Sequence, residues 1–494
     1  MSFTRPGGIV DRSFDLVRQS LLQDDSLPFA NALTTEHIAE AFAAEGVSFG
    51  EAPVTAKADV DDGIVYTMGV TLWAMLSQAI FTGIDRSCRA AVQRVAVYYA
   101  LAGREVSSTN TAGYCRARAQ VTEGVVRRLA EGVAERCEAA VPSEQLWHGF
   151  RTRLVDGSTL SLPDTEKNQA EYPQPSSQEE GLGFPIVRAV AMTSLVTGMV
   201  IAMAMGPYAG KRTGETALFR TLFAKLGPGD LVVTDRYFCG WFMLALLQEL
   251  GVEFVTRLHQ HRKADFTKGK RLGKGDHVTT WTKPKRPEWL DQEAYDRLPE
   301  QLEIREVEIN VVTAGFRTRS LVVVTSLREH EVYSSDEIAR LYQRRWTIEL
   351  ELRDIKSTMQ LGILRRKTPA AIRQELWTGI LAYNLVRQSM LQSAEASGVR
   401  PHQLSFTASL QMMNTTWVLA AVPPMVTISH RERLLALRIL NGHSHRVANR
   451  PNRIEPRAVK RRPSPIALLT ELRETARARL IEAQQKLEGH SQTT

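Results

Sequence analysis

Closely spaced cysteines are missing from this chain. Its 494 residues include four cysteines, Cys88, Cys115, Cys137 and Cys239, and none has C-x-x-C spacing. Zinc sites and small disulfide scaffolds depend on such spacing. We therefore expect reduced thiols in a cytoplasmic protein. The first residues also lack an apolar core segment, so we expect no signal peptide.

Long uncharged runs are almost missing as well. One such run, from Tyr66 to Gly83, just reaches the length of a membrane-spanning segment. It contains several polar residues, however, and Asp61 and Asp62 precede it where a basic flank would be expected. The run therefore predicts a buried core helix, and a membrane protein is the outside alternative.

Acidic residues are fewer than basic ones. The chain has 62 Lys and Arg against 54 Asp and Glu, a net charge of +8. This balance favours a polyanionic partner over an acidic small molecule. The hydrophobic content of 43% is typical of a globular protein, and the length allows several domains.

The first part of the chain has the apolar periodicity of helices. We predict that residues 1–145 form a helical, DNA-binding region. Arg116 and Arg118 lie along one of its helices, which either contacts DNA or presents an ordinary solvated basic face.

From Arg151 onward the pattern changes to strands. Three strands, a helix, a strand, a helix and a further strand are expected at 151–162, 184–194, 199–208, 215–226, 231–234, 241–250 and 253–258. This order predicts a mixed α/β sheet. A β-rich insertion, two helical stretches, a basic arm and a last helix follow at 261–327, 335–361, 368–397, 441–465 and 466–487.

Two aspartates lie on predicted strands, and one glutamate lies on a predicted helix. Asp156 follows the apolar residues Leu154 and Val155 and precedes Gly157, and Asp235 ends another strand. Strand ends of an α/β sheet are where ligands bind, although such residues are also common in turns. On the helix, Tyr342, Arg345, Glu349 and Lys356 share one flank beside the apolar stripe. An ordinary i, i+4 ion-pair ladder is the alternative for Glu349.

The pattern Y-x-x-R-x-x-x-E-x-x-x-x-x-x-K, formed by these four residues, resembles the signature of the insertion-sequence-four family of bacterial transposases. The segments VDGSTLSLPDT around Asp156 and VVTDRYF around Asp235 agree with that family, and so does the basic arm. The resemblance covers roughly residues 60 to 465.

The resemblance implies a ribonuclease-H-like catalytic core at 146–260 and 328–365, with the β-rich insertion at 261–327 and helical regions at 1–145 and 366–494. It implies a triad of Asp156, Asp235 and Glu349. Such carboxylates suit two Mg²⁺ or Mn²⁺ ions, because these ions prefer hard oxygen ligands. The implied activity is cut-and-paste transposition on double-stranded DNA, through hairpin ends, by a cytoplasmic homodimer.

Several further side chains are candidates for contacts with DNA. Tyr342, Arg345 and Lys356 are expected to hold phosphates, and basic residues near the site could assist them: Lys211, Arg212 and Arg236. Trp281 and Trp289 are candidates to stack on a base, or else they pack within the β-rich segment, whereas we assign Trp346 to packing. The alternative functions are a nuclease that does not insert DNA and a catalytically silent DNA-binding protein.

Overall fold

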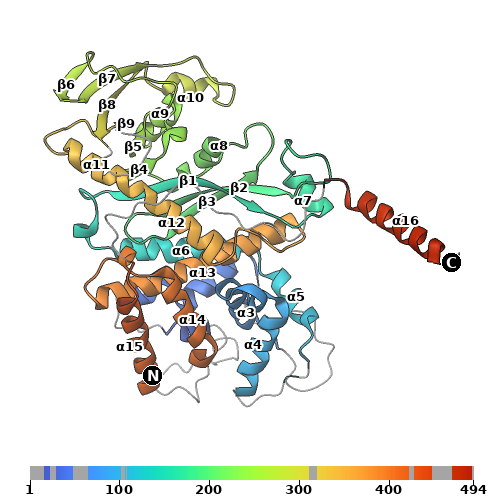
Figure 1. Cartoon of the computed structure of the whole chain (residues 1–494). Coiled ribbons are helices and arrows are strands. Elements are labelled where there is room, and N and C mark those ends of the chain that lie inside the picture. The colour runs from blue at the N-terminus through green and yellow to red at the C-terminus, as the bar shows by residue number, and fades with distance from the viewer. Residues whose placement is uncertain are drawn as a thin grey trace.

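The computed structural model describes residues 16–22, 29–47, 65–101, 106, 108–310, 320–421, 428–447 and 470–491. A single large sheet crosses this part of the chain, with helices on both of its faces (Figure 1). The basic arm expected at 441–465 lies mostly outside the described residues.

The sheet has nine strands in the order β3-β2-β1-β4-β5-β9-β8-β7-β6. β1 pairs antiparallel with β2, and β2 with β3, whereas β4 and β5 continue the sheet parallel to β1. Three antiparallel strands followed by two parallel ones are the core of the ribonuclease-H-like fold, so the expected fold class is confirmed. These five strands are β1 (Arg151–Ser161), β2 (Ile186–Ser194), β3 (Val200–Pro207), β4 (Asp230–Thr234) and β5 (Glu253–Arg257).

The remaining four strands extend the same sheet. β9 pairs antiparallel with β5, and β8, β7 and β6 follow outward. The β6 strand was not expected, because its sequence is basic and rich in turn residues. Gly275 explains the hairpin, since its φ of 65° suits a tight turn before β7. These strands are β6 (Lys270–Gly273), β7 (Asp276–Thr282), β8 (Gln301–Asn310) and β9 (Ser320–Thr325).

Apolar side chains divide the sheet into two faces. Leu154 of β1 and Val233 of β4 belong to the core cluster that contains Ile338, Leu341 and Ile348 of the later helices. Their neighbours along the strands belong to the larger cluster on the opposite face. Because side chains alternate along a strand, residues of the same parity as Leu154 and Val233 face those later helices.

Helices cover both faces (Figure 1). One face carries the helices α8 (Glu215–Thr221) and α9 (Trp241–Glu249). The other carries α11 and α12. α6 and α13 pack against each other, and α13 is buried on nearly every side and contacts α3, α6, α14 and α15. These helices are α6 (Glu123–Ala139), α11 (Ser335–Gln343), α12 (Thr347–Arg353) and α13 (Pro369–Ala396).

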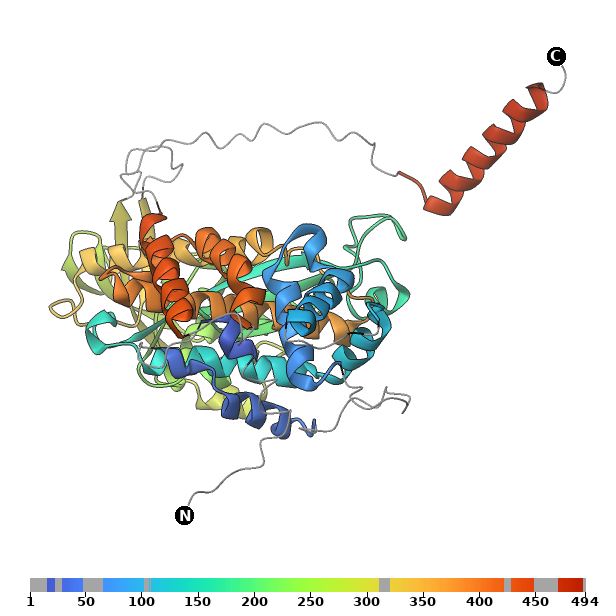
Figure 2. The same ribbon diagram turned by 90° about the horizontal axis from the view of Figure 1, so that it is seen from below.

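The terminal regions are helical, and Figure 2 shows them from below the sheet. The uncharged run that we examined for a membrane segment contains α3, whose residues are almost all buried. Among the described residues, no helix is both long enough and apolar enough to cross a bilayer. These helices are α2 (Thr35–Ala44), α3 (Met68–Ile80), α4 (Cys88–Leu101), α5 (Thr111–Gln120), α14 (Phe406–Ala421) and α15 (Ile428–Ser444).

Short helices and a separate C-terminal helix complete the described elements. α16 stands apart from the rest of the molecule in both views. It begins later and ends later than the helix expected at 466–487. The elements are α7 (Glu166–Glu171), α10 (Gln292–Arg297) and α16 (Arg473–Ser491).

Candidate active site

The register of two parallel strands places Asp156 beside Asp235. β1 and β4 pair up to Leu154 and Val233. Asp156 lies two residues further along β1, and Asp235, two residues beyond Val233, directly follows the last residue of β4. Both side chains therefore lie on the face covered by α11 and α12. The strand expected at 151–162 is confirmed by β1, which extends past Asp156. β1 continues to Ser161 through its pairing with β2, and only its pairing with β4 stops at Leu154.

Glu349 reaches the same face from a helix that is not continuous. The expected helix at 335–361 is divided into α11, a 3₁₀ turn at Arg344–Trp346, α12 and a π-helical turn at Asp354–Thr358. Ile348 and Ile355 of this stretch are buried as expected, while Glu349 is partly exposed. Such π turns widen a helix locally and are frequent at functional sites.

Arg345 links two of the three carboxylates. Its guanidinium lies 3.0 Å from Glu349 Oε1 and 3.6 Å from Asp156 Oδ2. Burial raises the pKa of Asp156 to about 6, and the nearby charges of Asp235 and Glu349 also raise it, against the lowering effect of Arg345. The three acids are therefore close enough to influence one another's ionisation.

The carboxylates do not form a closed ion site. Within the described ranges, no three His, Cys, Asp or Glu side chains converge closely enough to ligate one ion. This differs from the expected triad that shares ions, because the Arg345 guanidinium lies between Asp156 and Glu349. The donor chemistry still suits a hard divalent cation, since crowded carboxylates with a raised pKa are stabilised by positive charge.

Two further signature residues face the same strands. Lys356 Nζ donates a hydrogen bond of 2.9 Å to Ser158 Oγ, two residues beyond Asp156 on the same face of β1. Tyr342 is 6% exposed, and burial raises its pKa to about 12, so its phenol is a neutral donor near pH 7. The structure thus brings together all four residues of the helix pattern with the two aspartates.

Glu215 is an acidic neighbour that the sequence reading missed. It begins α8, and a Cβ on Gly157 would lie 2.2 Å from its carboxyl carbon, so a side chain at this position of β1 would displace the Glu215 carboxylate. Burial raises the pKa of Glu215, and the charge of Asp235 raises it further. The G-E-T sequence before α8 gave no spacing signal that could have identified it.

Comparison with known proteins identifies the family. The chain is 31% identical over 360 residues to the transposase InsG of insertion sequence element IS4 from Escherichia coli (strain K12), an alignment that covers 70% of this chain and 76% of that protein. The chain belongs to the IS4 family of DDE transposases. Residues 147–385 of this transposase match the family model described as a transposase DDE domain.

Other similarities are more limited. A transposase for insertion sequence element IS421 from Escherichia coli is 36% identical over 66 residues, which are 13% of this chain and 18% of that protein. A solved structure described as a piggyBac transposase synaptic complex with hairpin DNA aligns with a TM-score of 0.43 and 11% identity, over 86% of this chain and 85% of that chain.

The basic candidates of the transposase differ in their exposure. Four of them lie on the surface: Lys211, Arg212, Arg236 and Arg116. Arg118 is only 9% exposed, so the expectation that it lies on a solvated or DNA-facing surface of its helix was wrong. Its guanidinium turns inward because Gln78 and Cys88 accept its hydrogen bonds.

The tryptophans also differ from expectation. Trp281 is 7% exposed and donates a hydrogen bond to Glu306, so its ring is not available for stacking on a base. Trp289 is half-buried, with the Arg220 guanidinium 3.7 Å above its ring. Trp346, which we had assigned to packing, is 48% exposed and lies next to Arg345.

A second acidic pair occupies the opposite side of α12. Glu351 and Asp354 are both buried. Arg387 of α13 lies 3.7 Å from Asp354 Oδ2, and its Nε donates to the Tyr383 hydroxyl at 2.8 Å. Burial raises the pKa of Glu351 to about 7, although Arg387 opposes this effect.

Proposed function

We propose that this transposase cleaves and rejoins phosphodiester bonds at the terminal inverted repeats of an insertion sequence, with Asp156, Asp235 and Glu349 as its catalytic carboxylates. The parallel register of β1 and β4 carries this proposal, because it sets the two aspartates side by side on the face where Glu349 arrives. Three carboxylates around one edge of a sheet suit phosphoryl transfer, which depends on neutralising charge on the reacting oxygens.

Two Mg²⁺ or Mn²⁺ ions, when bound by these carboxylates, would neutralise charge on the attacking and leaving oxygens. Arg345 is placed to hold a phosphate oxygen, since its guanidinium already lies between two acids and can exchange that contact for a phosphate. Lys356 is a second cation beside β1, and the neutral Tyr342 hydroxyl can donate a hydrogen bond to a terminal phosphate.

The wider course of the reaction follows from the same assignment. A freed 3′ hydroxyl would attack the opposite strand and form a hairpin, which is then opened before insertion. Because two DNA ends must be held together, we propose a homodimer that acts on double-stranded DNA in the cytoplasm. The division into a helical region at 1–145, the core, an insertion at 261–327 and a helical region at 366–494 belongs to this proposal.

Cleavage of a supercoiled plasmid that carries the element ends, with Mg²⁺ present, tests the assignment. We expect the wild-type protein to nick and cut the ends and Glu349→Gln to be inactive. Glu331→Gln, which removes an exposed carboxylate outside the site, is the control and should remain active. Cutting without strand transfer would instead indicate a nuclease. A wild-type protein no more active than Glu349→Gln would indicate a silent DNA-binding protein.

A further inference from the structure

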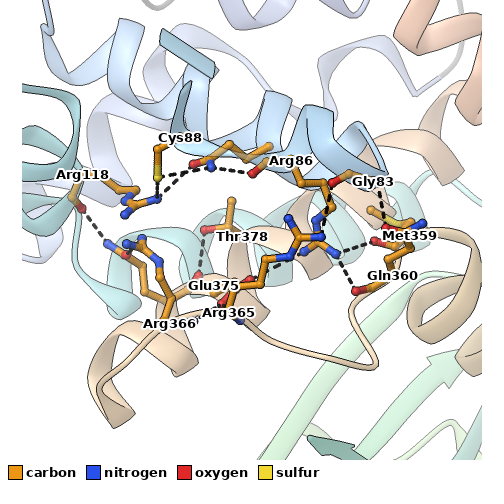
Figure 3. Close-up of polar contacts among 12 residues, drawn as sticks. Gly83, Arg86, Cys88, Arg118, Met359, Gln360, Arg365, Arg366, Glu375 and Thr378 are labelled. Atoms are coloured by element: carbon orange, nitrogen blue, oxygen red, sulfur yellow. Dashed lines mark hydrogen bonds and ion pairs between the residues drawn. The ribbon is translucent and has the colours of Figure 1, made fainter. Parts of the chain in front are cut away.

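An arginine-lined pocket lies between the N-terminal helices and the loop that follows the π turn. Its volume is about 320 Å³. Figure 3 shows Arg86 and Arg118 on one side and Arg365 and Arg366 on the other, with Glu375 of α13 between them. The four arginines come from three separate segments of the chain, so the fold has to bring them together.

The positive charges of this pocket are poorly compensated. Glu375 is its only acidic lining residue among the described residues, and its Oε2 already accepts the backbone N–H groups of Arg365 and Arg366. Its Oε1 lies 3.6 Å from Arg86. One carboxylate thus faces four guanidinium groups, which leaves an excess of three positive charges in a partly buried space.

Two of the arginines are almost entirely buried. Arg86 is 5% exposed and donates to the backbone carbonyls of Met359 and Gln360, at 3.2 and 2.5 Å. Arg118 is 9% exposed, and its Nε has no hydrogen-bond partner among the described residues. Burying a guanidinium without a partner for each N–H is costly, so negative charge bound beside these arginines would stabilise them.

The arginines also disfavour one another's charge. Burial lowers the pKa of Arg366, and the neighbouring Arg118 lowers it further. Burial likewise lowers the pKa of Arg86, and Arg365 adds to this effect against Glu375. A bound anion would relieve both repulsions, because it places negative charge between the guanidinium groups.

Part of the remaining wall is apolar and is formed by Met75, Ala79 and Leu361, and the rest is polar: Gln78, Ser87, Cys88 and Thr378. Guanidinium groups match the oxygens of a phosphate in a two-pronged geometry. An apolar wall beside them favours a ligand with an uncharged part attached to its phosphate. We propose that this pocket binds a nucleotide phosphate ester. The nucleotide belongs either to a bound DNA strand or to a free nucleoside monophosphate, and the DNA source rests on the proposed function.

Thermal unfolding of the full chain tests the pocket directly. The probe is thymidine 5′-monophosphate, compared with thymidine at matched ionic strength. We expect a saturable rise of the unfolding midpoint with the monophosphate and none with thymidine. Arg365→Gln/Arg366→Gln should lose this rise, whereas Arg89→Gln, which removes an exposed arginine of α4 outside the pocket, should keep it.

Two measurements guard against a misfolded variant. Arg365→Gln alone changes an exposed side chain and should weaken the response without affecting the fold. In the wild-type protein, the monophosphate should slow alkylation of Cys88, which lines the pocket, as read by peptide mass spectrometry. Unchanged labelling of Cys88 at saturating monophosphate, or a midpoint rise that survives in the double variant, overturns the proposal.

Binding of duplex DNA distinguishes the two sources. If a strand nucleotide enters the pocket, the double variant should bind duplex DNA about tenfold more weakly. The slope of log affinity against log salt should then fall by about 2. Unchanged DNA affinity together with a lost response to the monophosphate indicates a free nucleotide. Neither measurement involves catalysis, so the plasmid assay with Glu349→Gln can fail while the pocket still binds its ligand, and the reverse also holds.

Discussion

Two pairs of acidic residues lie on opposite sides of one short helical stretch. On one side, Glu349 lies with Asp156 at a solvent-accessible edge of the sheet, and one arginine contacts both of them. On the other side, Glu351 and Asp354 are buried against Arg387 of α13. Both sides contain a carboxyl group whose pKa burial raises, to about 6 for Asp156 and about 7 for Glu351.

The comparison shows that a raised pKa alone does not identify a catalytic acid. Glu351 and Asp354 line a pocket together with Arg387 of α13 and the turn that joins β2 to β3, and no third acid lines that pocket among the described residues. Glu349 and Asp156 lie where β1 continues beyond its pairing with β4. Two features distinguish the proposed site from a structural ion cluster: Glu349 is accessible to solvent, and a third acid, Asp235, lies nearby.

The largest expected effect is a difference in cleavage activity between variants on the two sides of the helical stretch. Asp235→Asn should reduce plasmid cleavage by more than about 10³-fold, because it removes a carboxylate worth several kcal/mol of charge stabilisation. Its amide oxygen can still accept the hydrogen bond from the Tyr237 N–H, so the fold should be kept. Asp354→Asn is the matched control and should cleave within about tenfold of the wild type. Equal losses in the two variants would contradict this prediction.

A second expected effect concerns the buried side, where Glu351 should make the free energy of unfolding depend on pH. The folded-state pKa of Glu351 is raised from its ordinary value of 4.5 to about 7, so the folded state keeps this proton to higher pH than the unfolded chain. Its contribution to the free energy of unfolding is therefore complete below about pH 4.5 and is lost as pH rises toward 7. The loss is ~3 kcal/mol, at 1.4 kcal/mol for each pKa unit.

Glu351→Gln should remove this part of the pH dependence. Denaturant unfolding of the wild type and the variant, at pH 5 and at pH 8, measures it. We expect the variant to gain stability relative to the wild type at pH 8. If the free energy of unfolding depends on pH in the same way in the wild type and in Glu351→Gln, then Glu351 has the same pKa in the folded and unfolded states, which would contradict the prediction.

A third effect concerns the acid side of the activity profile. Because Asp156 must be ionised to act as a ligand, cleavage should fall as pH drops below about 6. Arg345 holds the pKa of Asp156 down, so Arg345→Gln should move this fall to higher pH by about one unit. The measured quantity is the pH at which cleavage activity falls to half of its maximum, because the variant will also cleave more slowly at every pH. Arg353→Gln, an exposed arginine beside Asp354, should leave it in place.

The smallest expected effect concerns the exposed side of the helix. Trp346→Ala should slow cleavage of the element ends by about fivefold, as expected from the loss of about 1 kcal/mol of stacking on a base. Its unfolding midpoint should hardly change, since the ring is 48% exposed. The same substitution at the buried Trp281 should instead destabilise the fold. A wild-type rate in Trp346→Ala would leave this tryptophan without a role in DNA binding.

Much of the fold could be predicted from local patterns. The strands β1 to β5 follow from runs such as Leu231–Val233, because central parallel strands are apolar on both faces. β6 could not be predicted, since a hairpin of basic and turn residues carries no apolar alternation. The break between α11 and α12 was equally hidden, because a periodic apolar stripe does not register a 3₁₀ or π turn.

The site could be predicted only in part. Tyr342, Arg345, Glu349 and Lys356 were found by their spacing, since residues on one helix keep a fixed geometry. Glu215 was missed because it approaches through a gap left by a glycine on another element. The inward turn of Arg118 depends on hydrogen-bond partners that lie 30 and 40 residues away, and the pocket that it lines also depends on distant segments. Contacts between distant segments leave no periodic mark in a sequence.

The continuity of the sheet bears on how this protein could be shortened. β5 donates and accepts ladder hydrogen bonds with β9, so the segment from 261 to 327 is no detachable module. Removal of this segment would convert β5 from an interior strand into an exposed edge strand with unpaired backbone groups. Such edges recruit strands from other molecules. A trimmed version of this protein should therefore aggregate unless a charged or proline-containing replacement shields that edge.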